Sequence, residues 1–169
     1  MRRVDMYFDY ECPYCKKGFE DLLDILEELG DKNDLHMVWR PCEAHPRPEN
    51  HPPHTDLAIQ GYFLALSEKI DIMAYHKRMF DAVHTDRIDV EDPETLAEYL
   101  DPVLPKEKLL PVLEEGVYRQ AQERNNRLAY EENEVWYLPA FRLDGKKLDA
   151  EGGKGVTRED LKAFLEPDA

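Results

Sequence analysis

The sequence predicts an α/β fold in which a mixed sheet carries an inserted helical subdomain. Three observations support this prediction. Residues 3–39 show a strand, a helix and a strand in turn, residues 55–130 place apolar side chains at helical spacing, and residues 136–165 have the pattern of two strands followed by a helix. We therefore expect one discontinuous sheet domain, residues 1–54 and 131–169, with residues 55–130 as the helical insertion.

The first third of the chain has the pattern of a β-α-β unit. Residues 3–8 and residues 35–39 are rich in strand-forming side chains and predict two strands. Between them, apolar residues recur at helical spacing, Pro13 fits the first turn of the helix, and Gly30 fits its end. Because a helix connects the two strands, we expect them to be parallel.

The middle of the chain begins with a loop rich in proline and histidine at residues 41–53, which is the best candidate for a domain boundary. Helical spacing dominates the residues that follow, up to about residue 130. The pattern allows one long helix over residues 111–130. These segments together predict the helical insertion.

The last third has the pattern of a hairpin followed by a helix. Residues 136–143 predict a strand, Asp144 and Gly145 predict a tight turn, and residues 146–149 predict the return strand. Thr157 is a good N-cap for a final helix. This order adds two strands and one helix to the sheet domain.

Composition restricts the partners that we expect. The chain has 169 residues and a net charge of -15, so its surface should repel nucleic acids and anionic lipids. No apolar run approaches the roughly 20 residues that cross a bilayer. Asp5 and Asp9 stand where the apolar part of a signal peptide would be. We expect a cytoplasmic monomer with neither nucleic-acid nor membrane partners.

Three cysteines are too few for a disulfide framework, and two of them form the motif Cys12-Pro13-Tyr14-Cys15. Cys15 lies on the apolar stripe of the predicted helix, so it should be buried, whereas Cys12 precedes the first turn and should be exposed. The unpaired N–H groups and dipole of a helix N-terminus stabilise a thiolate. The motif therefore predicts a redox pair in which Cys12 attacks and Cys15 resolves.

Charged neighbours of Cys12 should act in opposite directions. Lys16 and Lys17 in the first helical turn should lower the pKa of Cys12, and Asp9 and Glu11 should raise it. We expect the helix terminus to dominate, because its donors contact the sulfur while the two carboxylates can turn towards water.

The sequence resembles the DsbA-like proteins in three places. The run YFDYECPYC at residues 7–15 resembles their active-site entry, the run WRPC at residues 39–42 resembles the end of their second strand, and the run LPAF at residues 138–141 resembles their cis-proline loop. The long helical insertion is also similar. The resemblance implies a thioredoxin-like fold and a thiol–disulfide oxidoreductase that needs no cofactor or metal.

The resemblance also implies roles for single residues. Pro139 should be a cis-proline that faces the cysteine pair, and we count it with Cys12 and Cys15 as catalytic. Without the resemblance, the residues alone favour an ordinary trans-proline at a strand start. The client is the protein or small thiol whose sulfurs are exchanged. Leu138 should offer its backbone to an extended client, and Pro13 and Tyr14 should contact the client too. Pro-Tyr between the cysteines is similar to glutaredoxins and points to glutathione among the clients.

Two alternatives stay open. Cys12, Cys15, Cys42 and His45 have spacings that resemble a zinc site with three cysteines and one histidine, which would make the chain a metal-binding or interaction module. A looser site could use Cys42 and His45 with His51 and His54. The other alternative is a glutathione-dependent isomerase or transferase, because families with that activity share the helical insertion.

Overall fold

The computed structural model describes residues 1–167 of the chain. Its strands form a four-stranded sheet in the order β2-β1-β3-β4. The elements in chain order are β1 (Arg2–Phe8), α1 (Pro13–Leu29), η1 (Gly30–Lys32), β2 (Leu35–Pro41), α2 (Asp56–Ser67), α3 (Ile72–His84), α4 (Pro93–Leu100), α5 (Lys106–Glu115), α6 (Arg119–Arg127), η2 (Leu128–Glu132), β3 (Ala140–Leu143), β4 (Lys146–Asp149) and α7 (Arg158–Leu165). This is the predicted α/β class with a mixed sheet.

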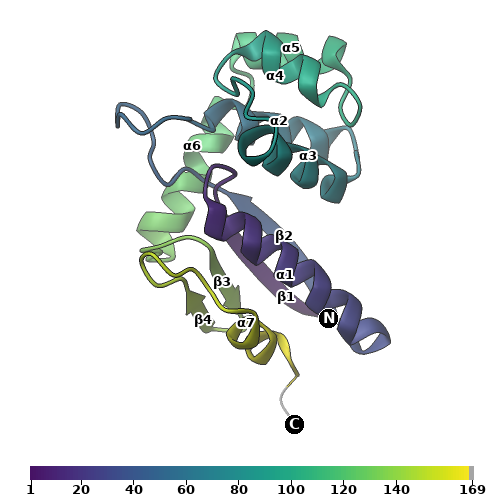
Figure 1. Cartoon of the computed structure of the whole chain (residues 1–169), viewed down its shortest axis with the longest axis vertical. Helices are drawn as coiled ribbons and strands as arrows, with labels where there is room; N and C mark the ends of the chain where they lie inside the picture. Colours follow the sequence, from purple (N-terminus) through teal and green to yellow (C-terminus); the bar gives the residue numbers. More distant parts are fainter. Residues whose placement is uncertain (168–169) are drawn as a thin grey trace.

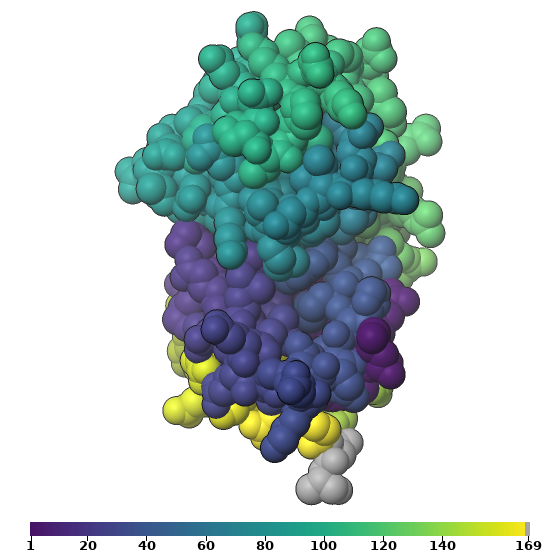
Figure 2. All heavy atoms as spheres, turned by 90° about the vertical axis from the view of Figure 1, so that its right-hand side faces the viewer, coloured from purple at the N-terminus to yellow at the C-terminus, as the bar shows by residue number. Residues whose placement is uncertain are grey.

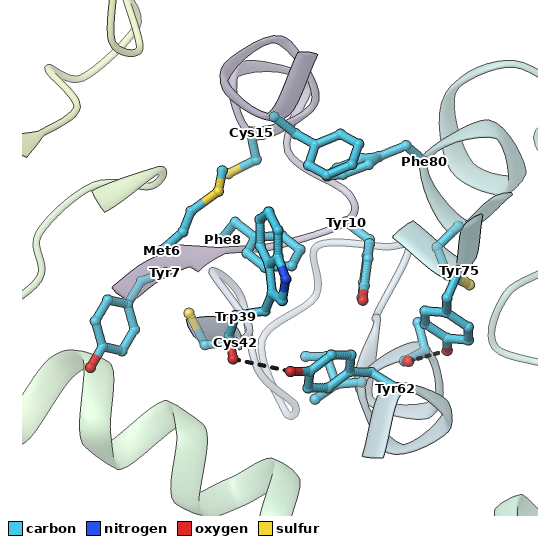
Figure 3. Packing of buried hydrophobic residues seen from close by; sticks show 14 of the residues in the cluster. Met6, Tyr7, Phe8, Tyr10, Cys15, Trp39, Cys42, Tyr62, Tyr75 and Phe80 are labelled. Carbon is cyan, nitrogen blue, oxygen red and sulfur yellow. Dashed lines mark hydrogen bonds between the residues drawn. The ribbon is translucent and has the colours of Figure 1, made fainter. Parts of the chain in front are cut away.

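The central strand β1 organises the sheet. It pairs in parallel with β2, as the β-α-β pattern predicts, and antiparallel with β3. Side chains alternate across it: Met6 lies on the side of Cys15 and α1, and Tyr7 points the opposite way (Figure 3). The Tyr7 hydroxyl accepts a hydrogen bond from the side-chain amide of Asn133 at 2.9 Å. Both faces of the second half of β1 are therefore covered, and Met6, Tyr7 and Phe8 are all buried.

The insertion continues the hydrophobic core of the sheet. Helices α2 to α5 gather beyond one end of β1 and β2, and α6 returns along the sheet to β3 (Figure 1). Aromatic side chains join the two parts: Phe8 and Phe19 pack on Phe80 and His76 of α3. The space-filling view shows the insertion directly on the sheet domain (Figure 2). The predicted boundary at residues 54 and 55 immediately precedes α2, and the boundary at residue 130 falls inside η2.

Two element predictions are wrong. The stretch of residues 111–130 is not one helix, because α5 ends at Gly116, whose φ of 65° is left-handed, and α6 starts only at Arg119. The predicted strand over residues 136–143 is shorter than expected and begins at Ala140. Pro139, immediately before it, has no N–H to give to a strand ladder.

The remaining element predictions are confirmed. Pro13 is the first residue of α1 and Gly30 ends it. Asp144 and Gly145, with φ values of 47° and 80°, form the hairpin turn between β3 and β4. The side chain of Thr157 accepts a hydrogen bond from the backbone N–H of Asp160 and so caps α7. Within residues 1–167, the helices are all too short or too polar to cross a membrane.

Candidate active site

Cys12 and Cys15 lie at the start of α1, where the chain leaves β1. Cys12 is the N-cap, and its sulfur accepts a hydrogen bond from the backbone N–H of Cys15 over 3.3 Å. Pro13 follows it at the first helical position, where the lack of an N–H costs nothing. Cys15 is fully buried and Cys12 is partly exposed, and both are free thiols. The structure thus gives the two sulfurs the different exposures that the sequence predicts.

The two thiols also differ in pKa. Hydrogen bonds from the Cys15 thiol and from the backbone N–H groups of Cys15 and Tyr14 lower the pKa of Cys12, although burial and the charge of Asp9 oppose them. Burial, and then the neighbouring Cys12 sulfur, raise the pKa of Cys15 well above its usual value. Cys12 is therefore the thiol that ionises first, and Cys15 stays protonated beside it.

The two lysines are directed elsewhere. Lys16 forms an ion pair with Glu20, and Lys17 forms one with Asp21 over 2.5 Å, each one turn further along the helix. These carboxylates compete with the sulfur for the lysine charges. The thiolate of Cys12 thus depends chiefly on hydrogen bonds at the helix start.

The expectation that Asp9 turns towards water is wrong. Asp9 is 1 % exposed, and its carboxylate accepts hydrogen bonds from the Thr55 hydroxyl at 2.6 Å and the Ala44 N–H at 2.8 Å. Burial raises its pKa to about 6, although these hydrogen bonds oppose the increase. Its backbone N–H points at the sulfur of Cys15 over 3.5 Å. The sequence indicates Asp9 as a neighbour of Cys12 but not its burial, because its partners come from a distant loop and from the residue before α2.

The segment before β3 brings a second wall to the site. The peptide bond between Leu138 and Pro139 is cis, as the family resemblance implies, and the carbonyl oxygen of Leu138 lies 3.9 Å from the sulfur of Cys12. A glycine permits this approach: a Cβ atom on Gly18 of α1 would lie 3.1 Å from Cγ of Pro139. Residues 126 positions apart in the chain therefore meet at Cys12.

Aromatic side chains lie within the cysteine motif and just before the cis-proline in the chain. The hydroxyl of Tyr14 donates a hydrogen bond to the carbonyl oxygen of Gly153 at 2.8 Å, so the ring lies on the glycine-rich turn after β4. Trp136 and Tyr137, just before the cis-proline, are 83% and 54% exposed. These two neighbouring rings leave apolar surface exposed to solvent.

The zinc arrangement predicted as an alternative does not form within the described residues. The sulfur of Cys42 is fully buried and lies 4.0 Å from the Tyr130 hydroxyl. His54 is occupied by Glu91 at 2.9 Å and by the carbonyl oxygen of Glu49 at 2.7 Å. Among residues 1–167, no group of three metal-capable side chains contains Cys12, Cys15 or Cys42.

Comparison with known proteins agrees with this geometry. Residues 3–162 match the family described as the DSBA-like thioredoxin domain. The uncharacterized protein YwbO of Bacillus subtilis is 24% identical in an alignment of 189 positions that covers 90% of this chain and 92% of YwbO.

Two solved structures have the same fold. Pseudomonas aeruginosa DsbA has a TM-score of 0.70 at 22% identity, covering 96% of this chain and 79% of its own. SCO1869 of Streptomyces coelicolor, assigned to the DsbA oxidoreductases, has a TM-score of 0.83 at 16% identity, covering 98% and 88%. The chain therefore belongs to the DSBA-like thioredoxin domain family.

Proposed function

We propose that the chain exchanges dithiols and disulfides in protein clients, with Cys12 as the attacking thiol and Cys15 as the resolving thiol. The observation that carries the proposal is the contrast between the two sulfurs. Cys12 is partly exposed and its pKa is lowered, whereas Cys15 is buried and its pKa is raised. A pair of this kind can meet a client with one sulfur and release it with the other.

Reduction of a client disulfide takes two steps. The Cys12 thiolate attacks one client sulfur, a Cys12–client disulfide forms, and the other client sulfur leaves as a thiolate. Cys15 then loses its proton and attacks Cys12, so that the Cys12–Cys15 disulfide forms and the second client thiolate leaves. The client gains two electrons and the pair loses two. Oxidation of a client dithiol is the reverse sequence.

Leu138 and Pro139 would align the client beside Cys12. The cis-proline segment borders the sulfur, and an extended client can bind its backbone as an added strand would. Pro13 and Tyr14, which follow Cys12 in the chain, would contact the client as well, and the exposed rings of Trp136 and Tyr137 would provide apolar area for a protein client. Glutathione would use only part of this surface, so we assign protein clients first.

Insulin reduction in the presence of a small dithiol tests the proposal. Cys12→Ser should abolish turnover, because it removes the attacking thiolate. Cys15→Ser, incubated with insulin without the small dithiol, should accumulate mixed disulfides with the client, because no second thiol releases it. Cys42→Ser is the matched control and should turn over like the wild type, because Cys42 is fully buried. Wild-type turnover by Cys12→Ser would overturn the assignment.

A further inference from the structure

The loop between β2 and α2 brings His45 and His51 next to Glu11, the residue before Cys12. One donor atom from each of the three side chains lies within 4.8 Å of the others, and this is the one group of three metal-capable side chains that residues 1–167 bring so close together. The two imidazole rings are stacked with their centroids 3.7 Å apart. Two of the histidines singled out in the sequence thus come together, with a carboxylate from a different segment in place of Cys42 and His54.

A hydrogen bond orients the side chain of His45, and burial restricts that of Glu11. Nδ1 of His45 contacts a carboxylate oxygen of Glu49 at 2.8 Å, which leaves Nε2 as its free nitrogen. Metal-binding histidines usually have such a carboxylate partner on the nitrogen that does not bind the metal. The backbone N–H of Glu11 is bonded to Asp9 at 3.2 Å, and the side chain of Glu11 is only 14% exposed.

The loop that carries both histidines is fixed at its two ends. Before His45, the N–H of Ala44 donates to the buried Asp9 over 2.8 Å. After His51, the side chain of His54 bonds Glu91 at 2.9 Å and the Glu49 carbonyl oxygen at 2.7 Å. Ligands held on an anchored loop lose little conformational freedom when they bind an ion.

We propose that Glu11, His45 and His51 bind a divalent transition-metal ion, for which Zn²⁺ is the best match. Two imidazoles and one carboxylate with an open fourth position are a known zinc ligand set. Nε2 of His51 lies 4.0 Å from Oε2 of Glu11. Ligands at about 2.0–2.2 Å from zinc stand roughly 3.4 Å apart, so binding requires the half-exposed His51 to turn out of its stack on His45 and towards Glu11. The bound ion would place positive charge one residue from Cys12.

Zinc binding is measured best without the redox thiols, because thiolates also bind zinc. Isothermal titration of Zn²⁺ into the full-length Cys12→Ser/Cys15→Ser variant should show one site. Adding His45→Ala or His51→Ala should weaken the zinc affinity at least about tenfold, because each removes a ligand. Glu49→Gln removes only the carboxylate that orients His45 and should weaken the affinity by about 10- to 100-fold. The control is His36→Ala, which alters an exposed histidine on β2 and should leave the affinity unchanged.

Thermal unfolding with and without Zn²⁺ provides a second measurement and shows that each variant is folded. Zn²⁺ should raise the Tm of the double-cysteine variant and of its His36→Ala derivative, because only the folded protein offers the three ligands together. The Tm of the His45→Ala derivative should not change, because one ligand is missing. The absence of zinc binding, or a zinc affinity that is unchanged in His45→Ala and in His51→Ala, would overturn the proposal. Both results are independent of disulfide exchange, since the redox cysteines are absent.

Discussion

Replacing Asp9 with Asn should make the protein relatively more stable as the pH increases. Asp9 is fully buried, and its pKa is raised from 3.8 to about 6 in the folded protein, chiefly by burial. The folded state therefore holds this proton more tightly than the unfolded state does. Stability contributed by the protonated group is present at low pH and is lost as the pH increases from 3.8 through about 6.

The size of the effect follows from the difference between the two pKa values. One pKa unit corresponds to about 1.4 kcal/mol, so the change from 3.8 to about 6 corresponds to about 3 kcal/mol of unfolding free energy. The wild type should lose this amount relative to Asp9→Asn between about pH 3.5 and pH 7.5. Changes in hydrogen bonding caused by the amide give an offset that does not depend on pH.

Urea unfolding followed by circular dichroism, at several pH values and with the thiols reduced, measures this difference. Other carboxyl groups titrate in both proteins, including Glu43, whose pKa burial raises to about 7, so comparing the two proteins largely removes their effect. Asp31→Asn, at an exposed position, is the matched control and should follow the wild type. A difference between Asp9→Asn and wild type that stays constant with pH would refute the assignment of a raised pKa to Asp9.

Three further predictions concern the site and the core. Mild oxidation should link Cys12 to Cys15 and leave Cys42 free, because the helix start holds the first two close while Cys42 is fully buried; peptide mapping checks this. The reduction potential of the Cys12–Cys15 pair should lie between those of thioredoxin, roughly -270 mV, and DsbA, roughly -120 mV. Tyr14→His adds a cation beside the Cys12 thiolate, so it should make the potential more oxidising by on the order of 30 mV for each pKa unit lost by Cys12. Equilibration with glutathione buffers measures both proteins, and a more reducing variant would contradict the prediction. Gly61→Ala should lower the unfolding free energy by about 1–3 kcal/mol, because the new Cβ would lie 2.4 Å from the hydroxyl oxygen of Tyr75; combining it with Tyr75→Phe should recover part of the loss in urea titrations.

Local pattern was enough for much of the fold. The β-α-β unit, the hairpin turn at Asp144 and Gly145, and the capped helix after Thr157 all follow from residues close together in the chain, and all three are present in the structure. The break between α5 and α6 was missed. Helical spacing continues across Gly116, and only its left-handed backbone shows that one helix ends there.

The sequence by itself determined the fold class and the cysteine pair, because apolar spacing, helix caps and a four-residue motif depend only on near neighbours. Tertiary structure alone decided the surroundings of that pair. Asp9 is buried because Thr55 and Ala44 reach it from other segments, and Cys12 faces Leu138 because Gly18 leaves room for Pro139. Burial and contacts between distant segments set the pKa values and the access of a client, and neither can be inferred from the spacing of residues along the chain.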